Sequence, residues 1–225
     1  MTRTKLSERQ LPRYSRGEER MNMITHIVGG GMGVIALVLG TVKAALSGDG
    51  FAIAGAIVFG LSLIILYTMS SIYHGLSVNV PTAKKVFQIL DHCTIFVLIA
   101  GTYTPITICN IREYNPIIAW TVFGVVWGAA ALGIVLNSID IKKYSKFSMV
   151  CYLAMGWCII FTGDTMIKSL GFMGSLLVLI GGVMYSVGAI FYGFTKKRRY
   201  MHSVFHILTC IGSAFHIAAV LIYVL

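Results

Sequence analysis

The sequence predicts an all-α integral membrane protein that crosses the bilayer seven times, with its N-terminus in the cytoplasm and its C-terminus outside. Of the 225 residues, 57% are hydrophobic and only 12% are charged, and the mean hydropathy is +0.82. Soluble domains carry about 25% charged residues. The apolar residues fall into seven long runs, and the basic residues gather in alternate segments between these runs. Water is therefore not the main solvent of this chain.

Each run is long enough to form one transmembrane helix. A helix rises 1.5 Å per residue, so about 20 apolar residues cross a hydrocarbon core about 30 Å thick. Strands of a membrane barrel are shorter and alternate in polarity, and backbone in lipid must pair internally, which favours helices here. Only the third run contains a formal charge, Asp91. In chain order the runs cover approximately residues 21–42, 51–80, 86–111, 115–139, 147–163, 170–195 and 201–225.

Proline and glycine residues indicate where these helices bend and pack. Pro105, in the third run, lacks a backbone N–H and should kink its helix. The glycines within 29–33 of the first run and at 181–182 of the sixth predict close contacts between helices. A phosphate-binding loop is the poorer interpretation, since no strand precedes either group.

The loops between the runs are too short for a soluble domain. We therefore expect a basic, mostly solvated cytoplasmic tail over residues 1–20 and a single seven-helix transmembrane domain over residues 21–225. The polar tail lacks a cleavable signal pattern, so the first run is expected to act as its own signal anchor. Five cysteines lie within or beside the runs without a CxxC pair, which favours packing over disulfide or metal roles.

The distribution of basic residues predicts the orientation. Of the 18 Lys and Arg residues, all but Lys43, Arg112 and Lys168 lie in the tail or in the loops after the second, fourth and sixth runs. The positive-inside rule places these basic segments in the cytoplasm. There they would contact anionic lipid headgroups of the cell membrane, so the net charge of +10 requires no nucleic-acid partner. The sequence carries no signal for an oligomeric state.

Ionisable side chains within transmembrane helices are costly, and they are therefore candidates for function. Asp91 and His92 are adjacent and point about 100° apart, which should direct His92 towards another neighbour. In the predicted topology several others lie within about 10 Å of the cytoplasmic boundary. These are His74, Asp91, His202 and His206.

His202 and His206 are four residues apart, which places both imidazoles on one face of a helix. Such a pair is either a metal-binding clip or two structural histidines. The presence of His74 and Asp91 at the same depth favours a metal. Three neutral imidazoles and one open position form the ligand set of a catalytic zinc site, whereas a calcium or magnesium cage would need more carboxylates.

Two further histidines have other expected roles. His216 lies ten residues beyond His206, about 15 Å deeper on a straight helix, so it cannot reach the same ion and should pack or donate a hydrogen bond. His26 forms a polar stripe with Glu19 and Asn22 at spacings of three and four residues. This stripe is expected to support the site or to pack between helices.

Several stretches of the chain together match a known family. In chain order they read EERMNMITHIVG, SSIYHGL, LDHCTIFVLIAGTYTP, GGVMYSVGAIFY and HSVFHILTCIGSAFH, and they extend from about Glu18 to the C-terminus. The order SxxxH, then D, then HxxxH across seven helices resembles the progestin and adipoQ receptor family, and within it the bacterial hemolysin III-like branch.

The resemblance implies a seven-helix bundle with one Zn2+ ion near the cytoplasmic side. Carried over by motif, the metal ligands are His74, His202 and His206, and the catalytic residues Asp91 and Ser70 flank the water at the zinc. The animal receptors of the family are similar to alkaline ceramidases in this site, which implies hydrolysis of a lipid amide. Bacterial relatives carry the hemolysin name and are linked to membrane homeostasis. This chain lacks a long cytosolic domain, which argues against hormone sensing.

The sequence leaves two functions open. In the first, a zinc-dependent hydrolase cleaves an amide or ester of a membrane lipid that enters from the bilayer, with Asp91 taking or relaying a proton and Ser70 orienting water or the oxyanion. In the second, a non-enzymatic membrane sensor or cytolysin uses a structural zinc as a brace between helices. Whether Asp91 binds the metal directly also stays open. A retinal protein is excluded because the last run contains no lysine.

Overall fold

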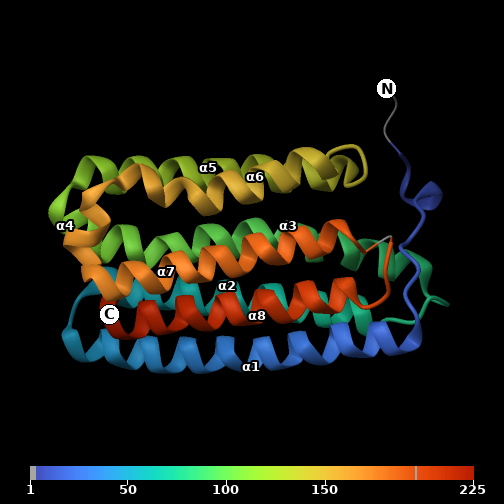
Figure 1. Cartoon of the computed structure of the whole chain (residues 1–225), viewed down its shortest axis with the longest axis horizontal. Coiled ribbons are helices and arrows are strands. Elements are labelled where there is room, and N and C mark those ends of the chain that lie inside the picture. Colours follow the sequence, from blue (N-terminus) through green and yellow to red (C-terminus); the bar gives the residue numbers. More distant parts are fainter. Residues whose placement is uncertain (1–3, 196) are drawn as a thin grey trace.

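The computed structural model describes residues 4–195 and 197–225. Within these residues, seven helices are long and apolar enough to cross a membrane. They run side by side along the long axis of the molecule (Figure 1). Their bounds are Arg16–Ser47, Gly50–Gly75, Pro81–Tyr114, Pro116–Asp140, Ser145–Thr162, Asp164–Gly193 and Met201–Val224. The predicted all-helical fold with seven long apolar helices is therefore confirmed for the described residues, and it is consistent with seven transmembrane spans.

The spans are built from α-helices and short segments of other helix types. In Figure 1, α1, α2 and α8 lie on one side of the bundle, α3 and α7 in the middle, and α5 and α6 on the opposite side. In chain order the elements are η1 (Leu6–Glu8), α1 (Arg16–Ser47), α2 (Gly50–Gly75), α3 (Pro81–Pro105), η2 (Ile106–Ile111), α4 (Arg112–Tyr114), α5 (Pro116–Asp140), α6 (Ser145–Trp157), η3 (Cys158–Thr162), α7 (Asp164–Gly193), α8 (Met201–Ala219) and η4 (Val220–Val224).

Local sequence explains how α1 begins and how it turns into α2. Ser15 caps α1 in a capping box, because its backbone N–H donates to Glu18 Oε2 at 2.8 Å and its Oγ accepts from Glu18 N at 3.3 Å. Gly48 ends the helix with φ 71°, a left-handed conformation that favours glycine. Asp49 then caps α2 by accepting a hydrogen bond from Phe51 N at 2.9 Å. The two helices are thus joined by a tight turn.

Pro105 changes the helix type within its span instead of ending it. Beyond Pro105 the chain continues as the π-helix η2, which accommodates the missing N–H without breaking the span. Thr104 and Thr107 on either side donate their hydroxyls to carbonyls one turn earlier, at 2.9 and 2.8 Å. The sequence did not predict a second irregularity, the left-handed φ of 69° at Gly171 within α7. The start of α7 also differs from the prediction, because the helix begins at Asp164 and not at 170.

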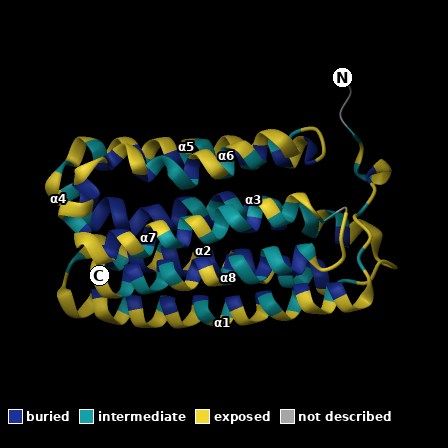
Figure 2. Cartoon of the chain, viewed as in Figure 1, coloured by how far each residue is buried: buried dark blue, intermediate teal, exposed yellow. Residues whose placement is uncertain are grey.

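Burial separates the interior of the bundle from its lipid-facing surface. The most apolar stretch of the span containing α3 is 78% buried, compared with 28% for α1 and α5. Figure 2 shows exposed residues along the outer faces of α1 and α5. The exposed face of α1 carries large apolar side chains such as Ile24, Ile27, Ile35 and Val38. Such a surface suits contact with lipid, as expected for a multi-pass membrane protein.

The predicted close contacts at glycine are confirmed at some positions and wrong at others. A Cβ at Gly29 of α1 would lie 2.6 Å from the ring of Tyr67 in α2. A Cβ at Gly181 of α7 would collide with the imidazole of His216 in α8. Gly31, in contrast, has no neighbour within 4 Å, because it faces outward from the bundle. Only the glycines on inward faces of the helices therefore let neighbouring side chains approach.

Candidate metal centre

Three histidines from two helices meet at the end of the bundle where α2 ends and α8 begins. His74 lies in the last turn of α2, and His202 and His206 lie in the first two turns of α8. All three side chains are buried, and one potential ligand nitrogen of each lies within 4.8 Å of those of the other two. This cluster, which we call the histidine cluster, can hold a metal ion.

Hydrogen bonds to α1 determine which nitrogens face the centre of the histidine cluster. His74 Nδ1 lies 2.6 Å from Glu19 Oε2, so its N–H donates to that carboxylate. His206 Nδ1 lies 3.3 Å from the backbone oxygen of Asn22 and donates there. These bonds leave the lone pairs on Nε2 of both rings. The Nε2 of His202 points to the Nε2 of His206 at 3.1 Å.

The positions of the histidine nitrogens suit a shared metal ion better than hydrogen bonds between the imidazoles. The 3.1 Å contact between the two Nε2 atoms can be one hydrogen bond or the approach of two metal ligands. Nitrogens bound at 2.0–2.1 Å to a tetrahedral zinc lie about 3.3–3.4 Å apart, which is close to this separation. His74 Nε2 is buried and has no hydrogen-bond partner within the described ranges. Such an atom is costly unless it binds something, so the cluster fits a bound metal.

A partly buried ion pair between Glu19 and Lys84 holds the His74 imidazole on the side away from the histidine cluster. Glu19 Oε1 accepts a hydrogen bond from Lys84 Nζ at 2.8 Å, while Oε2 accepts from His74. Lys84 is 1% exposed and also donates to the carbonyl of Leu76 at 2.8 Å. A carboxylate that accepts from a ligand histidine fixes its tautomer and ring orientation. The structure therefore corrects the interpretation of Lys84 as a loop charge, because this side chain turns into the bundle.

The polar stripe on α1 faces the histidine cluster. Ser203 Oγ donates to Asn22 Oδ1 at 2.6 Å, which links α8 to α1 beside the cluster. The ring of His26 stacks on that of His206, with centroids 3.7 Å apart and planes inclined by 10°. His26 also meets Tyr67 edge-on at 5.0 Å. His26 therefore packs against one histidine of the cluster and is not one of the three.

Asp91 and Ser70 lie beside the histidine cluster and are also buried. Ser70 is one turn before His74 in α2, and Asp91 is in α3. The Ser70 side chain lies near the Asp91 carboxylate, although its Oγ forms no well-aligned hydrogen bond with the part of the chain that is described. The Asp91 oxygens do not join the group of ligand atoms within 4.8 Å of one another. The five predicted site residues thus share one region, with Asp91 outside the group of three.

The expectation that His92 faces away from Asp91 is wrong. His92 Nδ1 lies 3.3 Å from Asp91 Oδ2 and 2.9 Å from the carbonyl of Gln88. The imidazole folds back along α3 to reach that carbonyl one turn earlier, and this rotation brings the ring beside its neighbour. Asp91 therefore has one imidazole next to it that does not belong to the histidine cluster.

Sequence reasoning missed Tyr14, which covers the histidine cluster. Its ring stacks on His202 with centroids 5.0 Å apart and meets His74 edge-on at 5.8 Å. Burial, together with the nearby Tyr192 and Glu19, raises the pKa of the Tyr14 phenol well above its usual value, so the ring is neutral. Tyr14 belongs to the tail that was expected to be solvated. A single tyrosine among basic residues gives no periodic signal that could have revealed this contact.

His216 lies apart from the histidine cluster, as its depth predicts. Its Nε2 is 3.0 Å from the carbonyl of Val178 in α7 and donates to it. His216 is not part of the group of three potential ligands. The structure therefore shows His216 as a hydrogen-bonding histidine between α7 and α8.

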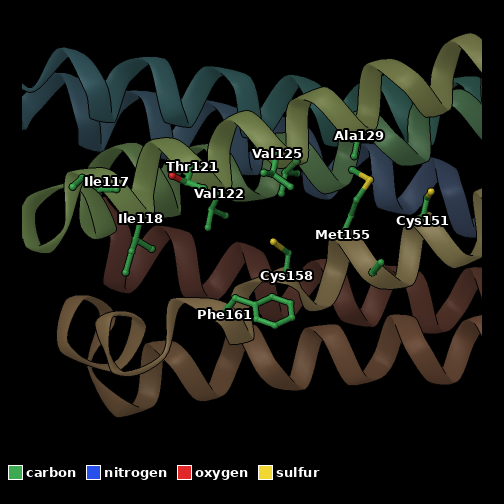
Figure 3. Close-up of a pocket in the computed structure, with 12 residues that line it drawn as sticks. Ile117, Ile118, Thr121, Val122, Val125, Ala129, Cys151, Met155, Cys158 and Phe161 are labelled. Carbon is green, nitrogen blue, oxygen red and sulfur yellow. The ribbon is translucent and has the colours of Figure 1, made fainter.

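An apolar groove lies between α5 and the α6–η3 segment and does not include the residues of the histidine cluster. Its volume is about 540 Å³, and apolar side chains such as Ile118, Val122, Met155 and Phe161 line it (Figure 3). The only titratable groups in its lining are two cysteines, Cys151 and Cys158. With no cluster of acids, bases or ligands, this groove offers little chemistry, and the histidine cluster remains the candidate site.

The fold and the site together define a multi-pass membrane protein with three histidines gathered inside the helical bundle. The chain matches the Haemolysin-III related family over residues 14–217 and belongs to that family. It is 37% identical over 208 residues to Hemolysin-3 of Bacillus cereus, with 92% of each chain covered. It is 36% identical over 206 residues to the Hemolysin-3 homolog of Bacillus subtilis (strain 168), covering 92% of this chain and 94% of the relative.

A more distant similarity extends to animal proteins. The chain is 26% identical over 167 residues to the human monocyte to macrophage differentiation factor, covering 72% of this chain and 67% of that protein. The predicted family resemblance is therefore confirmed.

Proposed function

We propose that this protein is a zinc-dependent hydrolase of an amide or ester bond in a membrane lipid, acting in lipid homeostasis of the cell membrane. The observation that carries the proposal is the geometry of the buried site. Three imidazoles converge, and a carboxylate lies beside them without joining the group. Structural zinc sites are usually closed by four protein ligands, whereas catalytic sites keep one position open.

The donor set supports zinc as the metal. Within residues 4–195 and 197–225, the histidine cluster contains neither a thiolate nor a carboxylate, and tetrahedral imidazole sites suit zinc. When bound, zinc would act as a Lewis acid and make a nearby water more acidic. The Glu19 carboxylate and the Lys84 ammonium would hold His74 in the tautomer that presents Nε2.

The residues around the histidine cluster suit the remaining steps of hydrolysis. Asp91 would accept a proton from water at its carboxylate and later donate it to the leaving group. The Ser70 hydroxyl would orient that water or donate to the carbonyl oxygen of the lipid as negative charge develops there. Tyr14 and Tyr192 pack against His202 and would keep bulk water away from the reacting groups.

A second candidate function follows from the names of the bacterial relatives and from the helices that the site joins. Hemolysin-3 is the name of the relative from Bacillus cereus. His74 belongs to α2, His202 and His206 to α8, and both helices are tied to α1 by hydrogen bonds. A metal here could brace a sensor or a cytolysin without any catalysis.

An assay of lipid cleavage separates these two functions. We expect purified, zinc-loaded protein in bilayers to release a fatty acid or another cleavage product from an extract of membrane lipids, as measured by mass spectrometry. His206→Ala protein, prepared in the same way, sets the background. If no lipid class gives a product above that background, the hydrolase proposal fails and the structural brace is the better interpretation.

The proposal also includes an orientation with the N-terminus in the cytoplasm. This orientation rests on the charge distribution, and it places the histidine cluster near the cytoplasmic face. In a background without the five native cysteines, Lys143→Cys should react with an impermeant reagent only from the cytoplasm. Glu113→Cys, at the other end of the bundle, should react only from outside. The reverse pattern of labelling would place the histidine cluster in the opposite leaflet.

A further inference from the structure

A second hollow lies beside the histidine cluster, between the N-terminal segment and the loop from α7 to α8. Its volume is about 420 Å³, and polar atoms form most of its surface. Tyr14 lines this hollow and also stacks on His202, so one side chain separates it from the histidine cluster. Four cationic residues line it: Arg13, Lys197, Arg198 and Arg199.

The positive charge of this hollow is not balanced by its own acidic residue. Glu18 is the one acid in the lining, and its oxygens are already engaged. Glu18 Oε2 accepts from the backbone N–H and the hydroxyl of Ser15, both at 2.8 Å, and Oε1 accepts from Tyr200 N at 2.8 Å. Among the ion pairs of the described residues, none involves the four cations. The charge of Arg199 does act on the Glu18 carboxylate. Four positive charges still face this single negative charge, so the hollow keeps donors for an anion.

The position of the hollow indicates which anion is available to it. Its lining lies where α1 and α8 begin, at Arg16 and Met201, and these are the ends of two apolar spans. The ends of transmembrane helices lie at the level of lipid headgroups, whose phosphates are the anions of that layer. The positive ends of both helix dipoles add to the charge of the four side chains. Guanidinium groups match phosphate oxygens with paired hydrogen bonds.

We propose that this hollow, which we call the basic hollow, binds the phosphate of an anionic phospholipid from the surrounding bilayer. Arg198 and Arg199 from the α7–α8 loop form one wall, and Arg13 from the N-terminal segment belongs to the other. A lipid held in this way would lie next to Tyr14, with its acyl linkages close to the histidine cluster. The proposal concerns binding alone and holds whether or not the histidine cluster hydrolyses lipid.

The test compares two pairs of charge-removing substitutions at the same end of the bundle. Purified protein is titrated with phosphatidylglycerol or phosphatidylcholine, and bound lipid is counted by native mass spectrometry. We expect wild-type protein to prefer phosphatidylglycerol, and Arg198→Gln/Arg199→Gln to weaken its binding about tenfold or more through the lost charge-assisted hydrogen bonds. Lys142→Gln/Lys143→Gln removes the same charge from the exposed α5–α6 loop and should bind like wild type.

Three outcomes would overturn the proposal. If the two double variants weakened the binding of phosphatidylglycerol equally, the lipid would be attracted to the basic surface in general and not to the basic hollow. Equal affinity of wild-type protein for the two lipids would remove the selection for anionic headgroups. Displacement of phosphatidylglycerol by inorganic phosphate or glycerol phosphate at similar concentration would mean that the basic hollow takes a soluble anion. If the double arginine variant does not fold, Arg13→Gln on the opposite wall provides the same comparison, and it too should weaken the binding of phosphatidylglycerol.

Discussion

Substitution of His206 by alanine is expected to yield protein that purifies with almost no zinc, whereas wild-type protein should carry about one zinc ion per chain. His202 and His206 supply two of the three candidate ligand nitrogens, and their Nε2 atoms lie 3.1 Å apart. Removal of either imidazole leaves two ligands where the site needs three. His202→Ala should therefore lose zinc as well. Thermal stability should fall in both variants, because the free energy of metal binding is part of the free energy of folding. Elemental analysis and thermal unfolding with and without a chelator measure these effects.

His216→Ala is the matched control for this prediction, because it removes a buried histidine from the same helix. It should keep its zinc, since His216 donates to Val178 O and lies outside the histidine cluster. Its stability should still fall somewhat through the lost hydrogen bond, by about 1 kcal/mol. Metal content therefore distinguishes ligand histidines from other buried histidines better than thermal stability does. Equal loss of zinc from all three variants would show that the assignment of ligands is wrong.

The seven spans were predictable from hydropathy and length, and helix rise predicted one shared depth for His74, Asp91, His202 and His206. The choice of the three histidines as the ligands came from the family resemblance. A charge-free run of about 20 residues has few alternatives to a transmembrane helix. Once the direction of each helix is assigned, the rise of 1.5 Å per residue gives the depth of every side chain. His74 near the end of α2 and His202 near the start of α8 then fall at one level, as the structure shows.

The supports of the site were not predictable, because they depend on contacts between segments far apart in the chain. Lys84 and Lys85 are neighbours of the same type, but Lys84 donates to Glu19 inside the bundle and Lys85 donates to the carbonyl of Ser7. Their difference arises from the face of α3 on which each lies. Tyr14 likewise reaches His202 only because α1 and α8 begin side by side. Hydropathy and spacing carry no information of this kind.

Asp91→Asn should separate a catalytic site from a structural one, because it removes a proton acceptor while keeping the size of the side chain. Asp91 lies outside the group of three ligand nitrogens, so the variant should retain nearly all of its zinc. Loss of a general base typically lowers the rate on the order of 10²-fold to 10⁴-fold, and we expect lipid hydrolysis to fall by about that factor. Zinc content and the rate of product release are measured on the same preparation.

The two measurements on Asp91→Asn give different patterns for different geometries. Loss of zinc together with activity would mean that Asp91 ligates the metal directly, contrary to its position beside the histidine cluster. Full zinc with unchanged hydrolysis would mean that another group takes the proton, and His92, whose Nδ1 lies 3.3 Å from Asp91 Oδ2, would be the first to test. Ser70→Ala provides the comparison for a smaller effect, because a hydroxyl that orients water or the oxyanion is replaceable in part by solvent. A buried carboxylate is costly in a lipid-embedded bundle unless it serves a polar site. Retained zinc with lost hydrolysis would therefore explain why Asp91 stands at this depth.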